Sequence, residues 1–220
     1  MIRQDYIMRM IEQLAKVLAK ILFNKEAGNY QEAINNIETA FDNILGLDYN
    51  LLNDLSDKDI ISLLEISEDN TTLGIKCIII AKLLKEKAEI KNLSNKENLN
   101  SVYNYQKALS LFLEGILTNK NIDIELSDYY ADVEEIVNKT NDYEISQDTR
   151  FKLFKFYELL GEYDKAENEL IKLKGLNYFK IEVEGLQFYR KLDKLSDIDL
   201  KKGNLSKEEV AKRLAEYARE

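Results

Sequence analysis

The chain has 220 residues, a formal net charge of −9 at pH 7, no proline, no histidine and one cysteine. The acidic charge repels a phosphate backbone, so we expect no nucleic-acid partner. Without histidine, the chain has no Ser-His or Cys-His nucleophile pair and no histidine ligand for a metal. A lone cysteine cannot form an intrachain disulfide, which favours a cytoplasmic location.

Three clusters of acidic residues are the remaining candidates for catalysis. They are Asp54, Asp57 and Asp59; Asp128, Asp132, Glu134 and Glu135; and Asp193, Asp197 and Asp199. Paired carboxylates can bind Mg²⁺ or act as acid and base. At these positions they are typical of solvated helix faces and helix caps, and no glycine-rich phosphate loop accompanies them. We therefore expect no enzyme, no cofactor and no metal site.

The first predicted helix covers residues 2–24 and is amphipathic. Its apolar residues recur at spacings of four and three, at Ile7, Ile11, Leu14, Leu18 and Ile21. We expect this stripe to be buried against the next helix, so that an aspartate at Ile11 or Leu14 would prevent folding. Two alternatives are a self-association seam, which would make a homodimer, and a helix lying on a membrane surface. Charged residues interrupt every apolar run, so we expect no targeting sequence and no membrane partner.

Further helices are predicted from apolar periodicity and from Ser or Asp residues at helix starts. They cover residues 30–45, 57–66, 72–91, 105–117, 127–138, 146–160, 163–173, 178–195 and 207–218. Residues 47–55 and 92–100 are predicted loops. Residues 119–126 alternate apolar and polar side chains, which indicates an extended connector because no second strand is present to pair with it. The sequence thus predicts an all-α chain of about nine to ten helices.

We expect these helices to form one domain over residues 1–220. A first hairpin covers 1–46, middle helices cover 57–118, C-terminal hairpins cover 127–195 and a terminal helix covers 206–218. A chain of this length can bury a core that needs no metal or disulfide. Within 178–195, Gly185 either weakens the helix or lets a neighbour approach closely.

One short pattern, a Tyr followed three residues later by Ala, occurs three times. The copies are Gly28, Tyr30 and Ala33; Tyr105 and Ala108; and Gly161, Tyr163 and Ala166. On a helix the Tyr and the Ala share a face, and an apolar residue follows each Ala at i+4. The small Ala lets a neighbouring backbone approach while the Tyr fills the adjoining gap. The pattern therefore predicts helices that pack in hairpins.

This pattern resembles the second helix of the tetratricopeptide repeat. Gly28, Tyr30, Ala33, Ile37 and Ala40 match the repeat fully. The copies are spaced further apart than one repeat of about 34 residues, so the resemblance implies a degenerate α-solenoid of antiparallel hairpins with inserted helices. The whole chain, from its first seven residues onward, also resembles a family of uncharacterised bacterial proteins with this helical layout.

The repeat resemblance implies a non-enzymatic scaffold that binds a protein or a peptide. An alternative is a receptor for a small ligand or a signalling peptide, with a pocket between helical hairpins. Tetratricopeptide domains that clamp a terminal carboxylate use Lys, Arg and Asn from the first helix of each hairpin. The corresponding positions here are Leu18, Leu22, Phe151 and Lys155, of which Lys155 alone has that character.

The motif itself generates a stability prediction. If Ala33 and Ala166 lie at close helix contacts, replacing either by Leu lowers the free energy of unfolding by about 1–3 kcal/mol, because extra methylenes enter a packed interface. Replacing Tyr30 or Tyr163 by Ala leaves a cavity and costs on the order of 3 kcal/mol. Chemical denaturation measures both effects.

Gln31 and Lys165, which neighbour the motif, are expected to be exposed and serve as controls. Their substitution should change the free energy of unfolding by less than about 0.5 kcal/mol. If the Ala→Leu variants behave like these controls, the hairpin interpretation is wrong.

Overall fold

The computed structural model describes residues 2–95, 99–119 and 126–218 and is all-α, as the sequence predicts. Within these ranges there are twelve α-helices, one π-helix and no strand. The nine to ten helices expected from the sequence are therefore fewer than the helices in the structure. Backbone contacts divide the chain into two compact units, Met1–Glu144 and Ile145–Glu220. The single continuous domain over 1–220 stays a prediction.

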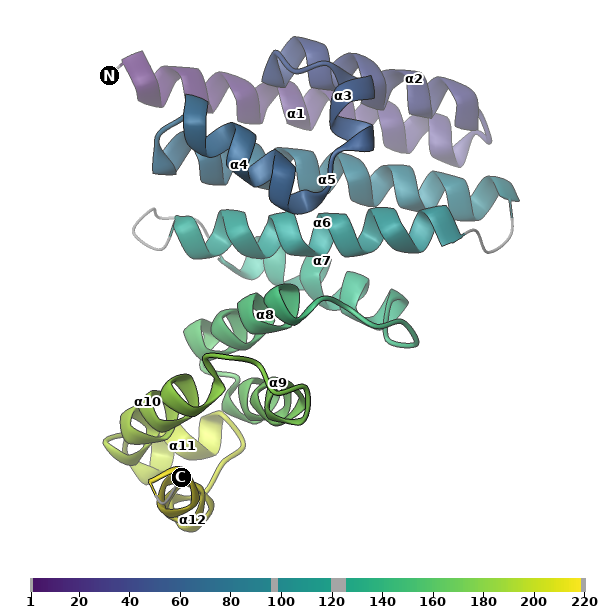
Figure 1. The fold of residues 1–220 in the computed structure, drawn as a ribbon. Coiled ribbons are helices and arrows are strands. Elements are labelled where there is room, and N and C mark those ends of the chain that lie inside the picture. Colours follow the sequence, from purple (N-terminus) through teal and green to yellow (C-terminus); the bar gives the residue numbers. More distant parts are fainter. Residues whose placement is uncertain (1, 96–98, 120–125, 219–220) are drawn as a thin grey trace. The chain divides into compact units, whose positions relative to one another are not determined.

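The first unit is arranged around one central pair of helices. Its elements are α1 (Ile2–Glu26), α2 (Tyr30–Ala40), η1 (Phe41–Leu45), α3 (Tyr49–Asp54), α4 (Asp57–Ser67), α5 (Asn70–Asn95), α6 (Leu99–Thr118) and α7 (Leu126–Lys139). Helices α1 and α2 form a hairpin whose turn contains Gly28 at a positive φ of 74°. Helices α5 and α6 form a second hairpin, and α5 lies between α6 and the α1–α2 pair (Figure 1).

Helix α5 is the core of this unit. Every residue from 72 to 81 is buried. A helix that is covered on all sides has neighbours on each face, and here α1, α2, α4 and α6 all contact α5. Among the described residues, no helix combines the length and the apolar composition needed to cross a membrane.

Two glycines allow the α5–α6 pair to pack closely. A Cβ atom added to Gly115 of α6 would lie 2.6 Å from the carbonyl oxygen of Gly74 in α5 and 2.7 Å from Cγ1 of Ile78. No real side chain tolerates contacts this short, so residue 115 must lack a Cβ at this crossing. A Cβ on Gly74 would instead overlap the side chain of Asn119, just beyond the end of α6. These close approaches explain a glycine at each position, where alanine would otherwise be favoured.

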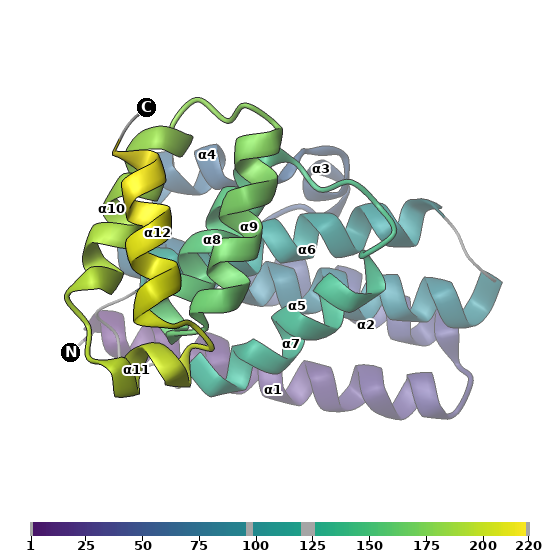
Figure 2. The same cartoon turned by 90° about the horizontal axis from the view of Figure 1, so that it is seen from below.

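The described part of the second unit, residues 145–218, contains five helices. They are α8 (Gln147–Leu160), α9 (Tyr163–Gly175), α10 (Ile181–Asp193), α11 (Asp197–Lys202) and α12 (Lys207–Tyr217). Helices α8 and α9 lie side by side, as do α10 and α12 (Figure 2). A Cβ on Gly185 of α10 would lie 2.2 Å from Cε1 of Tyr217, so of the two interpretations of Gly185 the structure supports close approach.

The two additional helices are short and lie where sequence periodicity is too brief to detect. Helix α3 falls in the predicted loop 47–55, and the Asp48 side chain caps it by accepting a hydrogen bond from the Leu51 amide at 2.9 Å. Helix α11 is capped by Ser196. Ser206 and Glu209 form a capping box at the start of α12.

Three predicted boundaries also need correction, and one predicted segment is not described. Helix α5 runs to Asn95 and α6 begins at Leu99, so most of the predicted loop 92–100 is helical. Helix α10 begins at Ile181 rather than at residue 178. The predicted connector 119–126 lies mostly outside the described residues.

The predicted burial of α1 is wrong in part. Leu14 is buried, whereas Ile11 is 41% exposed. The reason is that the helix is covered only on the side where Met10, Leu14 and Ile21 face its neighbours α2 and α5. The other side of the apolar stripe stays in solvent.

The close α5–α6 crossing predicts that adding a single methyl group at Gly115 destabilises the protein. Gly115→Ala places a Cβ against the backbone of α5 and should lower the free energy of unfolding by about 1–3 kcal/mol, despite the better helix propensity of Ala. Gly175→Ala is the matched control, because a Cβ there meets nothing within 4 Å. The control should be neutral or stabilising by up to about 1 kcal/mol in urea denaturation. Equal stability of the two variants would contradict the close crossing.

Candidate functional site

The repeated Tyr and Ala residues lie inside the helix packing. Ala33, Ala108 and Ala166 are completely buried, and Tyr105 is 1% exposed. Tyr30 and Tyr163 are half-buried, and the Tyr163 ring lies against Gly203. These residues offer little surface to a ligand, so the site must be found elsewhere.

One detail of the motif corrects an expectation. Lys165 is half-buried rather than exposed, and its ammonium lies 5.4 Å from the centre of the Tyr157 ring. Gln31 is exposed and is therefore the better of the two controls.

The first candidate site is a groove beside α1, here called the α1 groove. Its cavity is about 140 Å³. Ile75, Ile78 and Ile79 of α5 form the floor. Residues of α1 form one wall, and Tyr129 of α7 lies at the other, with Lys82 beside it. The lining is almost entirely apolar, and the lining residues of α1 are Ile11, Leu14, Ala15 and Leu18.

An uncharged band on α1 continues the groove onto the surface. The band consists of residues that fall within about 100° of each other on the helix, counting 100° per residue. They are Met8, Ile11, Ala15, Leu18, Ala19 and Leu22. Met8 is 51% exposed and Leu22 is 42% exposed. We call this set the α1 band, and it is wide enough to pack against a further helix.

Ion pairs hold the walls of the groove in place. Lys25 of α1 pairs with Glu86 of α5 at 2.7 Å and with Glu89 at 2.6 Å. From α7, Asp132 binds both Lys82 and Lys85 of α5, at 2.8 Å and 2.7 Å. Helices α1 and α7 are thus both fastened to α5, and the groove between them keeps its shape without an occupant.

The same network shifts the pKa values of Glu135 and Lys139, two residues of α7. Burial favours the neutral form of Glu135, but hydrogen bonds from Lys139 and Lys85 outweigh it and lower the pKa of this carboxyl. Burial likewise opposes the charge on Lys139, yet its bonds to Glu135 and the nearby Glu89 raise the pKa of this ammonium. Glu135 and Lys139 are therefore both ionised across the physiological pH range.

Two further buried lysines fasten the short helix α3 to the α5–α6 pair. Lys107 of α6 donates to the carbonyl oxygens of Leu52 at 2.7 Å and Asn53 at 3.3 Å, and also to that of Leu55. These are the carbonyls that a helix leaves unpaired at its C-terminus. Lys87 of α5 donates to the Asn53 side chain, so both ammonium groups serve α3.

Burial changes the ionisation of this lysine pair. Desolvation, together with repulsion from Lys91 and Lys107, lowers the pKa of Lys87 to about 8. Desolvation also lowers the pKa of Lys107 to about 8, against the attraction of nearby carboxylates led by Asp57. Burial raises the pKa of Tyr49, whose ring lies 4.8 Å from the Lys87 ammonium, to about 12. The pair therefore loses its charge just above neutral pH.

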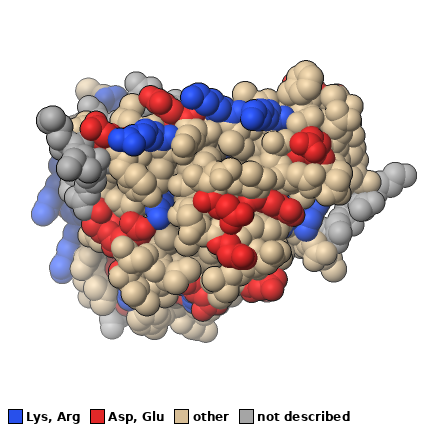
Figure 3. Space-filling model, turned by 90° about the horizontal axis from the view of Figure 1, so that it is seen from above, with Lys and Arg blue, Asp and Glu red and all other residues tan. Residues whose placement is uncertain are grey.

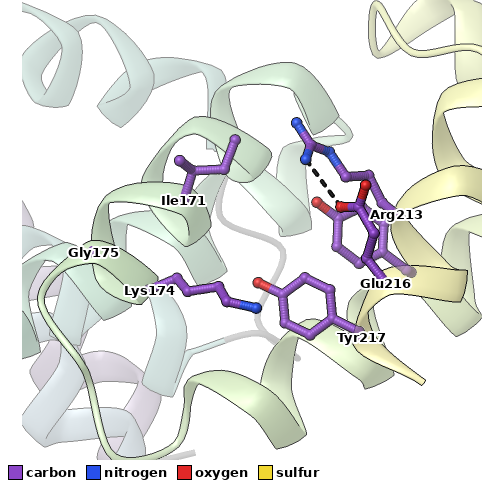
Figure 4. A pocket seen from close by; sticks show the side chains of 7 residues that line it. Ile171, Lys174, Gly175, Arg213, Glu216 and Tyr217 are labelled. Atoms are coloured by element: carbon purple, nitrogen blue, oxygen red, sulfur yellow. Dashed lines mark hydrogen bonds and ion pairs between the residues drawn. The ribbon is translucent and has the colours of Figure 1, made fainter. Parts of the chain in front are cut away.

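The second candidate site is a pocket of about 300 Å³ in the second unit, shown in Figure 4. Helix α9 supplies the side chains of Ile171 and Lys174 and helix α12 those of Arg213, Glu216 and Tyr217. The other two lining residues are Gly175 and Tyr189.

The charged groups of this pocket bind one another. The Tyr189 hydroxyl donates to Glu167 at 2.7 Å, which together with burial raises the pKa of Tyr189. Arg213 pairs with Glu167 at 3.4 Å and, as Figure 4 shows, with Glu216 at 3.2 Å. Lys174 lies 4.5 Å from the Tyr217 ring centre and pairs with Glu182 at 3.8 Å. The cations are already neutralised, so the pocket presents no net charge for an ionic ligand.

Other side chains noted in the sequence, Lys155 and Cys77 among them, are paired or buried within the fold. Lys155 pairs with Glu184 at 2.7 Å and with Glu158 at 3.2 Å, so its ammonium is engaged within the second unit. Among the described residues, no group of three or more acidic or cysteine side chains is placed to hold a metal ion. Cys77 is completely buried in α5.

The lysine pair predicts an unusual dependence of stability on pH. Each lysine releases its proton near pH 8 in the folded protein but near pH 10.5 in the unfolded chain. Between these values the unfolded chain binds more protons, so the free energy of unfolding should rise with pH by on the order of 1–2 kcal/mol per lysine. Urea denaturation at a series of pH values measures the rise.

Lys87→Met should remove about half of this rise, because one of the two titrating groups is lost. Lys212→Met, at an exposed position of α12, is the control and should leave the profile unchanged. A wild-type profile that is flat above pH 8 would contradict the assignment.

Comparison with known proteins adds a family but no activity. No curated protein and no solved structure matches the chain. The family DUF6483, described as a family of unknown function, matches residues 1–220. This match agrees with the expected likeness of the whole chain to an uncharacterised family. The chain therefore belongs to the DUF6483 family of unknown function.

Proposed function

We propose that the protein is a non-enzymatic scaffold that binds an amphipathic helix of another protein in the α1 groove. The observation that carries the proposal is the α1 band, an uncharged and exposed strip of α1 that runs directly into an apolar cavity. Exposed apolar strips joined to a groove are typical of sites that bind a helix through residues at i, i+3, i+4 and i+7.

The dimensions of the site support this occupant. From Met8 to Leu22 the band extends about 21 Å along α1, which matches about four turns of a partner helix. The small side chains of Ala15 and Ala19 lie between larger ones, so a partner backbone can approach the middle of the band. Tyr129 supplies a large ring at the far wall, where interfaces are enriched in tyrosine.

The proposal includes a degenerate tetratricopeptide-like architecture and a cytoplasmic location. The repeated Tyr and Ala residues, together with the hairpins α1–α2 and α8–α9, support the first. The lone cysteine, buried and unable to form an intrachain disulfide, fits the second. The lack of histidine supports a role without catalysis.

A receptor that uses the pocket of the second unit is the second candidate. The pocket is larger, at about 300 Å³, and has two tyrosine rings in its lining. We rank it lower because Arg213 and Glu216 already satisfy each other, so a polar ligand would have to displace existing ion pairs.

Selection of helical peptides from a displayed library tests the proposal. Peptides that bind the wild-type chain should carry apolar residues at helical spacing. They should lose at least about tenfold in affinity for Ile11→Arg and for Leu22→Arg, because a charge would enter the apolar contact.

Ile66→Arg is the matched control. Ile66 lies on α4 of the same unit, is 87% exposed and does not line the groove. Binders that are insensitive to Ile11→Arg and Leu22→Arg, or equally sensitive to Ile66→Arg, would show that the groove is not the site. Thermal unfolding of each variant checks that the fold is intact.

A further inference from the structure

A line of acidic residues follows one edge of the α1 band. Asp5, Glu12 and Glu26 are separated by seven and fourteen residues, so they lie along one line of the helix. All three are exposed. Ala19 occupies the remaining position of the line, so the edge contains three carboxylates and no cation.

This line lies between the apolar band and the basic residues of α1. At 100° per residue, Glu12 falls about 20° and Asp5 about 40° beyond Ala19, whereas Lys16, Arg9 and Lys20 fall about 60°, 80° and 100° beyond it. In the view from above, basic and acidic side chains both lie along one edge of the face, and further acidic side chains lie across its middle (Figure 3). On this edge of the band, a helix therefore meets Glu12 and Asp5 before it meets Lys16. On the opposite edge, Lys25 lies about 20° beyond Leu18, but its ammonium is already paired with Glu86 and Glu89.

The carboxylates nearest the band are available to a partner. Among the described residues, neither Glu12 nor Glu26 takes part in an ion pair, unlike the acidic residues of α5 and α7. The net charge of −9 adds a long-range attraction for cations. Both effects favour an occupant with positive charge along one edge.

A second copy of the chain fits this edge less well. A two-fold interface brings the same surface from both copies together, and when the two α1 helices pair antiparallel the acidic line faces another acidic line. Like charges across an interface disfavour the pairing. Charge therefore disfavours an antiparallel homodimer through the α1 band, and a parallel one gains no cation opposite the line from Arg9, Lys16 or Lys20.

Resting on the proposed function, we infer that the occupant of the α1 groove is an amphipathic helix with Lys or Arg along the edge that faces Asp5, Glu12 and Glu26. The apolar face of this helix packs on the α1 band, and its basic edge pairs with the carboxylates. The band supplies the contact area and the acidic line supplies the orientation and the selectivity.

Two synthetic peptides of about 21 residues test the inference. Both carry leucine at alternating spacings of three and four, and their flanking positions are lysine in one and glutamate in the other. At about 0.05 M NaCl the lysine peptide should bind the full chain at least about tenfold more tightly, and the difference should shrink at about 0.5 M NaCl, because salt screens exposed charges. Fluorescence anisotropy measures both affinities.

The double variant Glu12→Gln and Glu26→Gln should reduce the preference for lysine severalfold while the glutamate peptide binds no worse. Glu65→Gln, at an exposed position of α4, is the matched control and should leave the preference unchanged.

Three outcomes separate this inference from the proposed function. Equal binding of the two peptides, lost in Ile11→Arg, would overturn the inference and leave the scaffold proposal standing. No binding by either peptide, with a dimer in sedimentation that Ala15→Arg dissociates, would identify a second copy as the occupant and overturn the inference. No binding and a monomer at all concentrations would overturn both.

Discussion

The close crossing of α5 and α6 at Gly74 and Gly115 is the constraint on which the first unit depends. Because the two backbones touch there, the pair forms a thin and rigid centre, and other helices must cover the faces of α5 that α6 leaves open. Helix α1 covers one of these faces with only half of its apolar stripe. The groove is the space that remains between α1 and α7 over the floor of α5.

Lysines on the central helices connect this core to its surroundings. Lys82 and Lys85 bind α7, Lys87 and Lys107 bind α3, and Lys76 binds Glu68 just beyond the end of α4 at 2.6 Å. A long lysine side chain can pass through an apolar layer and place its charge at the rim. Ion pairs therefore hold α7 in place, and with it the wall of the groove that contains Tyr129. Apolar packing holds the α5 floor of the groove in place.

The amino-acid sequence allows the all-α class, most helix positions and the buried alanines to be predicted, because these follow from local periodicity and caps. Helices α3 and α11 escape prediction because six residues are too few to establish a period. The exposure of Ile11 also escapes, because periodicity identifies an apolar stripe but not how much of it a neighbour covers. The α1 groove depends on residues from three helices, and the sequence points to it only through the apolar stripe of the first predicted helix.

The anchoring of α3 by Lys107 has a consequence for the order of folding. A helix of six residues is unstable alone, since nucleation costs more than so few hydrogen bonds return. Its terminal carbonyls are held by a side chain more than fifty residues later in the chain. Helix α3 therefore forms only after α6 has docked on α5, and the segment from Tyr49 to Asp54 is among the last parts of the first unit to become ordered during synthesis.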